Sequence, residues 1–146
     1  MRHCLRIGIL VLSLWVAVTQ AEIQVQDGYV RGMPPGQATT AAFMRLLNSG
    51  SEDVVIDGGA TDAAKRVEFH QHVHKDDMMS MRQVPSITVP AGGEFVLEPG
   101  HFHLMMIDLL APLREGDTVT LQLRSGSKEV LSAKLPVRSV LNEHQH

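Results

Sequence analysis

Apolar and polar residues alternate over short stretches along most of the chain. Ile23 and Val25 alternate with glutamines, and the same two-residue period returns over 67–74 and 102–109. Turn-forming Asp-Gly and Pro-Gly pairs separate these stretches. No long segment shows the 3.6-residue period of an amphipathic helix. The pattern predicts an all-β fold of about eight short strands, arranged as a Greek-key β-sandwich or barrel.

Local sequence signals indicate where turns, a bulge or a short helix can occur among these strands. Residues 41–47 fit either a strand or a short helix by propensity. Asp27-Gly28 predicts a turn after the first strand, and Lys75-Asp76-Asp77 predicts another after the alternating segment. Pro85 predicts an edge or a bulge within the extended segment 79–89.

The N-terminal segment has the three-part pattern of a secretory signal peptide. Two arginines precede an apolar run over 7–18, and small residues after it predict cleavage after Ala21. The run is short for a membrane-spanning helix, although an uncleaved anchor is the alternative. With 146 residues in all, we expect a signal peptide over 1–21, one exported domain over 22–141 and a short polar tail over 142–146.

Charge and cysteine content exclude several classes of protein. The formal net charge is −3 and no basic stripe is present, which argues against a nucleic-acid partner. The single cysteine, Cys4, lies ahead of the apolar run, where we expect no lipidation, and would be removed with the signal peptide. The mature chain then has no thiol for a disulfide or an iron–sulfur site. It also lacks the thiolate that an electron-transfer cupredoxin needs.

Histidine and methionine are concentrated in one part of the chain. Five of the eight His and five of the eight Met lie within residues 70–106, about a quarter of the sequence. Successive strand residues point to opposite faces, so His70, His72 and His74 share one face. The spacing of His103 and Met105 likewise places an imidazole beside a thioether.

This combination of ligands suits a soft cation. Thioethers bind Cu(I) well and compete poorly for Mg²⁺, Ca²⁺ or Zn²⁺. A His/Met site also avoids thiolate oxidation outside the cytoplasm, although Met itself can form a sulfoxide. Individual His and Met residues can also have a purely structural role, without binding metal. We expect Met106 to lie in the core with Phe102 and Leu104, and His74 to be a solvated polar residue.

Five segments in and around the histidine- and methionine-rich region form a recognisable series: Val67-Glu68-Phe69-His70, Met78-Met79-Ser80-Met81-Arg82, Val89-Pro90-Ala91-Gly92-Gly93, Glu98-Pro99-Gly100 and His103-Leu104-Met105-Met106. In these segments the sequence resembles the PCu(A)C family of periplasmic copper chaperones. The family signature is a His, ten residues, a Met, twenty-one residues and then His-x-Met, and the chain matches it without a gap at His70, Met81, His103 and Met105.

The resemblance implies a cupredoxin-like sandwich that binds Cu(I) through those four residues. It also implies delivery of copper to the copper A subunit of cytochrome c oxidase, alongside an SCO-type thioredoxin-like partner. His101 stands where the family usually has glycine. We therefore treat His101, His72 and Met79 as candidate additional ligands.

Other functions remain open at this stage. A periplasmic copper or silver buffering or resistance protein without a dedicated client needs the same site as a chaperone. We expect no enzyme, because the sequence offers no assignable nucleophile–base pair, paired carboxylates or cofactor motif. A purely structural adhesive sandwich would take up no metal. His144 and His146 in the tail are candidates for a weak secondary Cu(II) site.

Overall fold

The protein is built from β-strands alone over the part of the chain that the computed structural model describes, residues 23–139. The predicted signal peptide over 1–21 and the tail over 142–146 lie outside these residues. Within residues 23–139, no helix is long and apolar enough to cross a membrane. The strands are β1 (Ile23–Arg31), β2 (Thr39–Asn48), β3 (Val54–Ile56), β4 (Gly58–Thr61), β5 (Ala64–Lys75), β6 (Met78–Val84), β7 (Ile87–Val89), β8 (Glu94–Leu97), β9 (Phe102–Leu109), β10 (Thr118–Ser125) and β11 (Lys128–Arg138).

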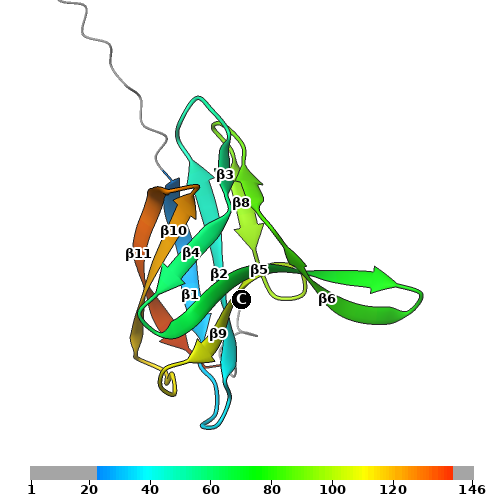
Figure 1. Cartoon of the computed structure of the whole chain (residues 1–146), viewed down its shortest axis with the longest axis vertical. Helices are drawn as coiled ribbons and strands as arrows, with labels where there is room; N and C mark the ends of the chain where they lie inside the picture. The colour runs from blue at the N-terminus through cyan, green and yellow to red at the C-terminus, as the bar shows by residue number, and fades with distance from the viewer. Residues whose placement is uncertain (1–22, 140–146) are drawn as a thin grey trace, which may run out of the picture.

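Nine strands form one curved sheet, which gives an open sandwich (Figure 1). The order is β4-β10-β11-β1-β2-β9-β5-β6, with β8 pairing the second half of β2, while β3 and β7 pair with each other. The β1–β11 pair is parallel and the other pairs are antiparallel. The all-β sandwich predicted from the alternation is confirmed.

The structure resolves the local ambiguities of the sequence. Residues 41–47 lie in strand β2 and not in a helix. The expectation of a turn at Asp27-Gly28 is wrong, because β1 continues through this pair and the β1–β2 register shifts there. Asp27 has a φ of 55°, which fits a bulge within a continuous strand. Pro85 separates β6 from β7, because proline cannot donate to a ladder.

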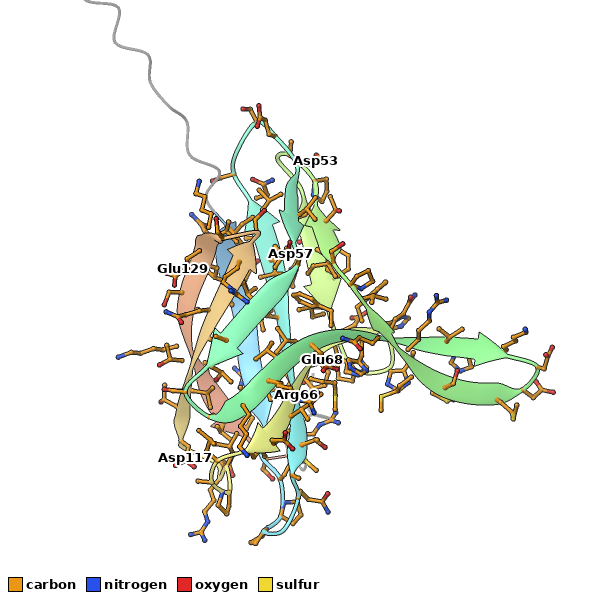
Figure 2. The ribbon with its side chains drawn as sticks, viewed as in Figure 1. Asp53, Asp57, Arg66, Glu68, Asp117 and Glu129 are labelled. Carbon is orange, nitrogen blue, oxygen red and sulfur yellow. The ribbon has the colours of Figure 1, made fainter. Side chains whose placement is uncertain are left out.

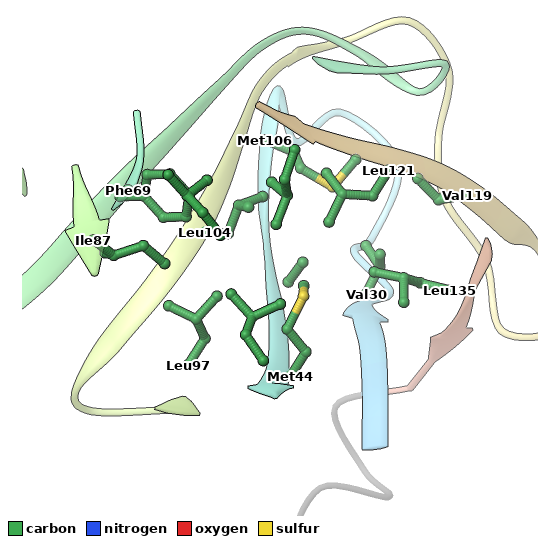
Figure 3. Close-up of a cluster of buried hydrophobic side chains, with 14 of the residues drawn as sticks. Val30, Met44, Phe69, Ile87, Leu97, Leu104, Met106, Val119, Leu121 and Leu135 are labelled. Atoms are coloured by element: carbon green, nitrogen blue, oxygen red, sulfur yellow. The ribbon is translucent and has the colours of Figure 1, made fainter. Parts of the chain in front are cut away.

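The core is an apolar layer between the two halves of the sheet (Figure 3). Phe69 of β5 and Leu104 and Met106 of β9 point into it. Across the layer they meet side chains of the opposite strands, among them Leu121 of β10. Burying one such side chain stabilises the fold by about 1.5–3 kcal/mol. The expected core position of Met106 is confirmed, since its side chain is fully buried.

One hairpin leaves this sandwich. The end of β5 and the start of β6 extend away from the body as a two-stranded ribbon (Figure 1). Asp76 and Asp77 connect them with φ values of 51° and 60°. Positive φ at both central residues is typical of a type I′ turn, whose twist matches the flanking strands. The turn expected after Lys75 is therefore present, and it places the histidines of β5 opposite the methionines of β6.

Candidate metal site

Three neighbouring strands, β9, β5 and β6, bring the predicted ligands onto one face of the sheet. His103 of β9 lies directly opposite His70 of β5. Along the other edge of β5, where β6 pairs with it, His72 lies opposite Met81. Directly opposed residues and residues two apart on a strand share a face. Met105, two residues after His103, therefore joins the same face.

A pocket of about 270 Å³ opens on this face. His72, Met81, His103 and Met105 all line it. Its remaining walls come from β1, β2, the loop that joins these two strands and the Pro99-Gly100 turn. The lining residues in these segments are Arg31, Met33, Thr39, Thr40, Ala41, Phe43, Pro99 and Gly100. Two thioethers and two imidazoles thus converge on a single cavity.

His103 is held in a fixed orientation at the base of the pocket. The residue is only 3% exposed, and its Nδ1 lies 3.1 Å from the carbonyl oxygen of His101. A carbonyl can only accept, so Nδ1–H donates this hydrogen bond. The neutral ring then presents its Nε2 lone pair, which is the form that binds a metal.

The surroundings of His103 also favour its neutral form. Burial lowers its pKa below the ordinary value of 6.5. The hydrogen bond to His101 works in the opposite direction, and the charges of His72, His70 and Arg31 add to the lowering. A lowered pKa reduces the competition between protons and metal at mildly acidic pH.

His70 is oriented by a carboxylate. Its Nε2 donates to Oε2 of Glu68 at 3.0 Å, and Glu68 also accepts from Arg66 at 3.1 Å (Figure 2). Nδ1 of His70 is buried and has no hydrogen-bond partner. A histidine that donates one N–H to a carboxylate and keeps the other nitrogen free is the usual arrangement of a metal ligand.

The four residues predicted from the signature do not all occupy the same position relative to the pocket. Met81, His103 and Met105 line it, whereas His70 does not. The His70 and His103 rings nevertheless lie 6.0 Å apart between centroids. His72 lines the pocket, with its ring 5.0 Å from that of His103 and its Nδ1 also buried without a partner.

The other candidate ligands lie outside the pocket. The His101 ring is exposed, with Nε2 3.8 Å from Oε1 of Glu98, and the residue contributes its backbone carbonyl to the orientation of His103. Met79 lies further along the hairpin, opposite His74. The exposed position expected for His74 is confirmed.

The ligands on this face fit a soft ion. In the described residues, no group of three or more His, Cys, Asp or Glu side chains is arranged to hold a metal. The thioethers of Met81 and Met105 line the pocket beside the imidazoles of His72 and His103. Thioethers select Cu(I) over hard divalent cations.

Two residues at the site were not predicted from the sequence. Glu68 shares the alternating face with His70, and that spacing was the available signal for its contact with the imidazole. Arg31 lines the pocket from β1, with its guanidinium 4.9 Å from the ring centroid of Phe43. No local pattern indicates that contact, because β1 reaches the pocket only through the order of strands in the sheet.

The lowered pKa of His103 predicts that the metal-free protein loses stability as the pH falls. The unfolded chain takes up this proton near the ordinary pKa of 6.5, and the folded protein only at a lower pH. The His103 contribution is therefore complete above about pH 6.5 and is lost as the pH falls toward the folded pKa. Urea unfolding between about pH 7.5 and 5 should show this decline, with a shallower slope for His103→Gln. Equal slopes in the two proteins would contradict the lowered pKa.

The sequence is similar to proteins described as lipoproteins. The family model "Putative lipoprotein LpqE-like" matches residues 23–137. "Putative lipoprotein Lxx21020" of Leifsonia xyli subsp. xyli is 31% identical over 117 residues, which cover 80% of this chain and 69% of the relative.

Solved structures with the same architecture include copper-bound domains. The solution structure of CuI-DR1885 from Deinococcus radiodurans has a TM-score of 0.65 and 32% identity, covering 84% of this chain and 83% of that one. The copper-bound PCuAC domain from PmoF2 also has a TM-score of 0.65, at 17% identity, covering 81% of this chain and 93% of that domain. The expected cupredoxin-like fold is confirmed. The chain belongs to the LpqE-like family, which is the PCu(A)C family of copper-binding domains.

Proposed function

We propose that this protein is an exported, periplasmic metallochaperone that carries Cu(I). The observation that carries the proposal is the convergence of Met81, Met105 and the oriented His103 on one pocket. A carboxylate-oriented His70 beside them completes a set of two thioethers and two imidazoles. Soft thioethers stabilise the monovalent ion, and neutral imidazoles add affinity without adding charge.

The assignment of His70 as the fourth ligand is part of the proposal. Both His70 and His72 have a buried Nδ1 without a partner, and the hydrogen bond to Glu68 is what favours His70 over His72. His72 stays at the hairpin side of the pocket, next to Met81.

The geometry suits release as well as binding. Met81 is 55% exposed, whereas His103 is buried. A receiving site can therefore displace the outer thioether first, while the inner ligands still hold the ion. Thiolates of the receiving site then draw Cu(I) away, because they bind it more strongly than thioethers do. No electron is transferred in this exchange.

Export is supported by the N-terminal pattern and by the description of the relatives as lipoproteins. We propose cleavage after Ala21, which would remove Cys4 together with the apolar run. The mature protein then lacks thiols and binds copper through thioethers and imidazoles.

Delivery to the copper A subunit of cytochrome c oxidase is the finer part of the proposal, with an SCO-type protein handling the thiols. The test mixes Cu(I)-loaded protein with the metal-free copper A domain, with and without the SCO-type partner. We expect transfer of Cu(I) to the domain when the receiving thiols are reduced, and the copper A spectrum once an added one-electron oxidant converts the loaded Cu(I)/Cu(I) centre to its mixed-valence state. Copper that stays on the protein would instead indicate a buffering or resistance protein.

A further inference from the structure

The β5–β6 hairpin carries histidine and methionine in matched pairs beyond the pocket. His72 lies opposite Met81, and the next pair on the same face is His74 opposite Met79. Residues opposite each other have Cβ atoms about 4.5–5.5 Å apart. Successive pairs on one face lie about 7 Å apart along the strands. The hairpin face thus continues the ligands of the pocket outward toward its tip.

The second pair is open to solvent. Met79 is 61% exposed and His74 is also exposed. The hairpin extends away from the sandwich, so no other strand covers this end (Figure 1). The turn beyond it is formed by Asp76 and Asp77, which are exposed as well.

The opposite face of the hairpin has a different composition. Lys75 lies opposite Met78 and Val73 opposite Ser80, so that face has no pairing of imidazole with thioether. Met78 is even more exposed than Met79, at 72%. The pairing is therefore a property of one face, and exposure of methionine alone does not account for it.

We propose that His74 and Met79 form a second, weaker Cu(I) site near the hairpin tip, from which the ion passes along His72 and Met81 into the pocket and leaves by the same path. The proposal rests on the proposed function of the pocket. One imidazole and one thioether are soft donors suited to Cu(I), and two ligands hold the ion less tightly than four. Each step exchanges one neutral donor for another, so copper remains Cu(I) throughout.

The individual methionines can report the order in which the sites fill. The protein is labelled with ¹³C at the methionine methyl groups and titrated anaerobically with up to two equivalents of Cu(I). We expect the Met105 and Met81 methyl signals to move with the first equivalent and the Met79 signal with the second. Met78 is the matched control on the other face and is expected not to move.

The two proposals fail in different ways in this titration. If Met105 and Met81 respond but Met79 behaves like Met78 up to two equivalents, the hairpin site is excluded and the pocket is unaffected. If Met105 and Met81 do not respond, the proposed function of the pocket is wrong, and the path leading to it is wrong as well.

Variants of the second pair test the path kinetically. In the His74→Gln, Met79→Leu protein we expect the second equivalent of Cu(I) to bind at least about tenfold more weakly. The affinity for the first equivalent is expected to stay unchanged. Release of the first equivalent to a bulky Cu(I) chelator should slow by about fivefold or more. Met78→Leu is expected to behave as the unmodified protein does. Unchanged binding of the second equivalent, or an unchanged release rate, in the double variant would overturn the proposal.

Discussion

Replacing Met81 and Met105 together by leucine is expected to weaken Cu(I) binding by about a hundredfold or more. Each thioether is worth about tenfold in affinity, or about 1.4 kcal/mol, when its site depends on soft donors. Both side chains line the pocket, and leucine has a similar volume, so folding should survive. Competition with a Cu(I) chelator measures the affinity, and thermal unfolding checks the fold.

Met106→Leu is the matched control for this experiment. Met106 follows Met105 in the chain but is fully buried in the core, on the opposite face of β9. The same change of methionine to leucine there is expected to leave Cu(I) affinity unaltered. Equal affinity in the double variant and in Met106→Leu would remove the role of the thioethers.

The second large effect separates the two histidines of β5. His70→Gln is expected to lower Cu(I) affinity by about tenfold or more, because it removes one of the four proposed ligands. His72→Gln is expected to lower it by less than about threefold, because the proposed assignment places His72 on the path and not among the four ligands. The chelator competition used for the methionine variants measures both proteins.

Glu68→Gln tests the same assignment through the residue that orients His70. Loss of the carboxylate that orients His70 should weaken Cu(I) binding by about tenfold, as for other carboxylates that hold metal ligands. In the His70→Gln background the same change should have little further effect. A large loss in His72→Gln with little in His70→Gln would reassign the fourth ligand to His72.

Alternation along the chain was sufficient to predict which residues share a face. The two-residue period placed His70, His72 and His74 together, and His103 with Met105, as the structure confirms. This succeeds because the side-chain direction in a strand is a local property of the backbone. The core position of Met106 follows from the same rule.

The register and the order of the strands could not be predicted from local sequence patterns. The contact between His103 and His70 depends on the register of β9 against β5, which nonlocal hydrogen bonds determine. The position of Arg31 depends in addition on the order of β1, β2 and β9 in the sheet. The predicted turn at Asp27-Gly28 was wrong for a related reason, since pairing with β2 keeps the chain extended through a bulge.

The projection of the hairpin was likewise not predicted. The sequence indicated the turn at Asp76 and Asp77, but not that the strands around it would leave the sandwich. Met81 and Met79 are exposed because of this projection, and their exposure makes a stepwise exchange of ligands sterically accessible.

X-ray absorption at the copper edge of the Cu(I)-loaded protein tests the central claim most directly. Sulfur and nitrogen neighbours of copper scatter at different distances and can be counted separately. With one equivalent bound, the proposed site predicts two sulfur ligands, from Met81 and Met105, and two nitrogen ligands, from His70 and His103. A spectrum that contains only nitrogen or oxygen neighbours would contradict a thioether site and, with it, the proposed mechanism of transfer.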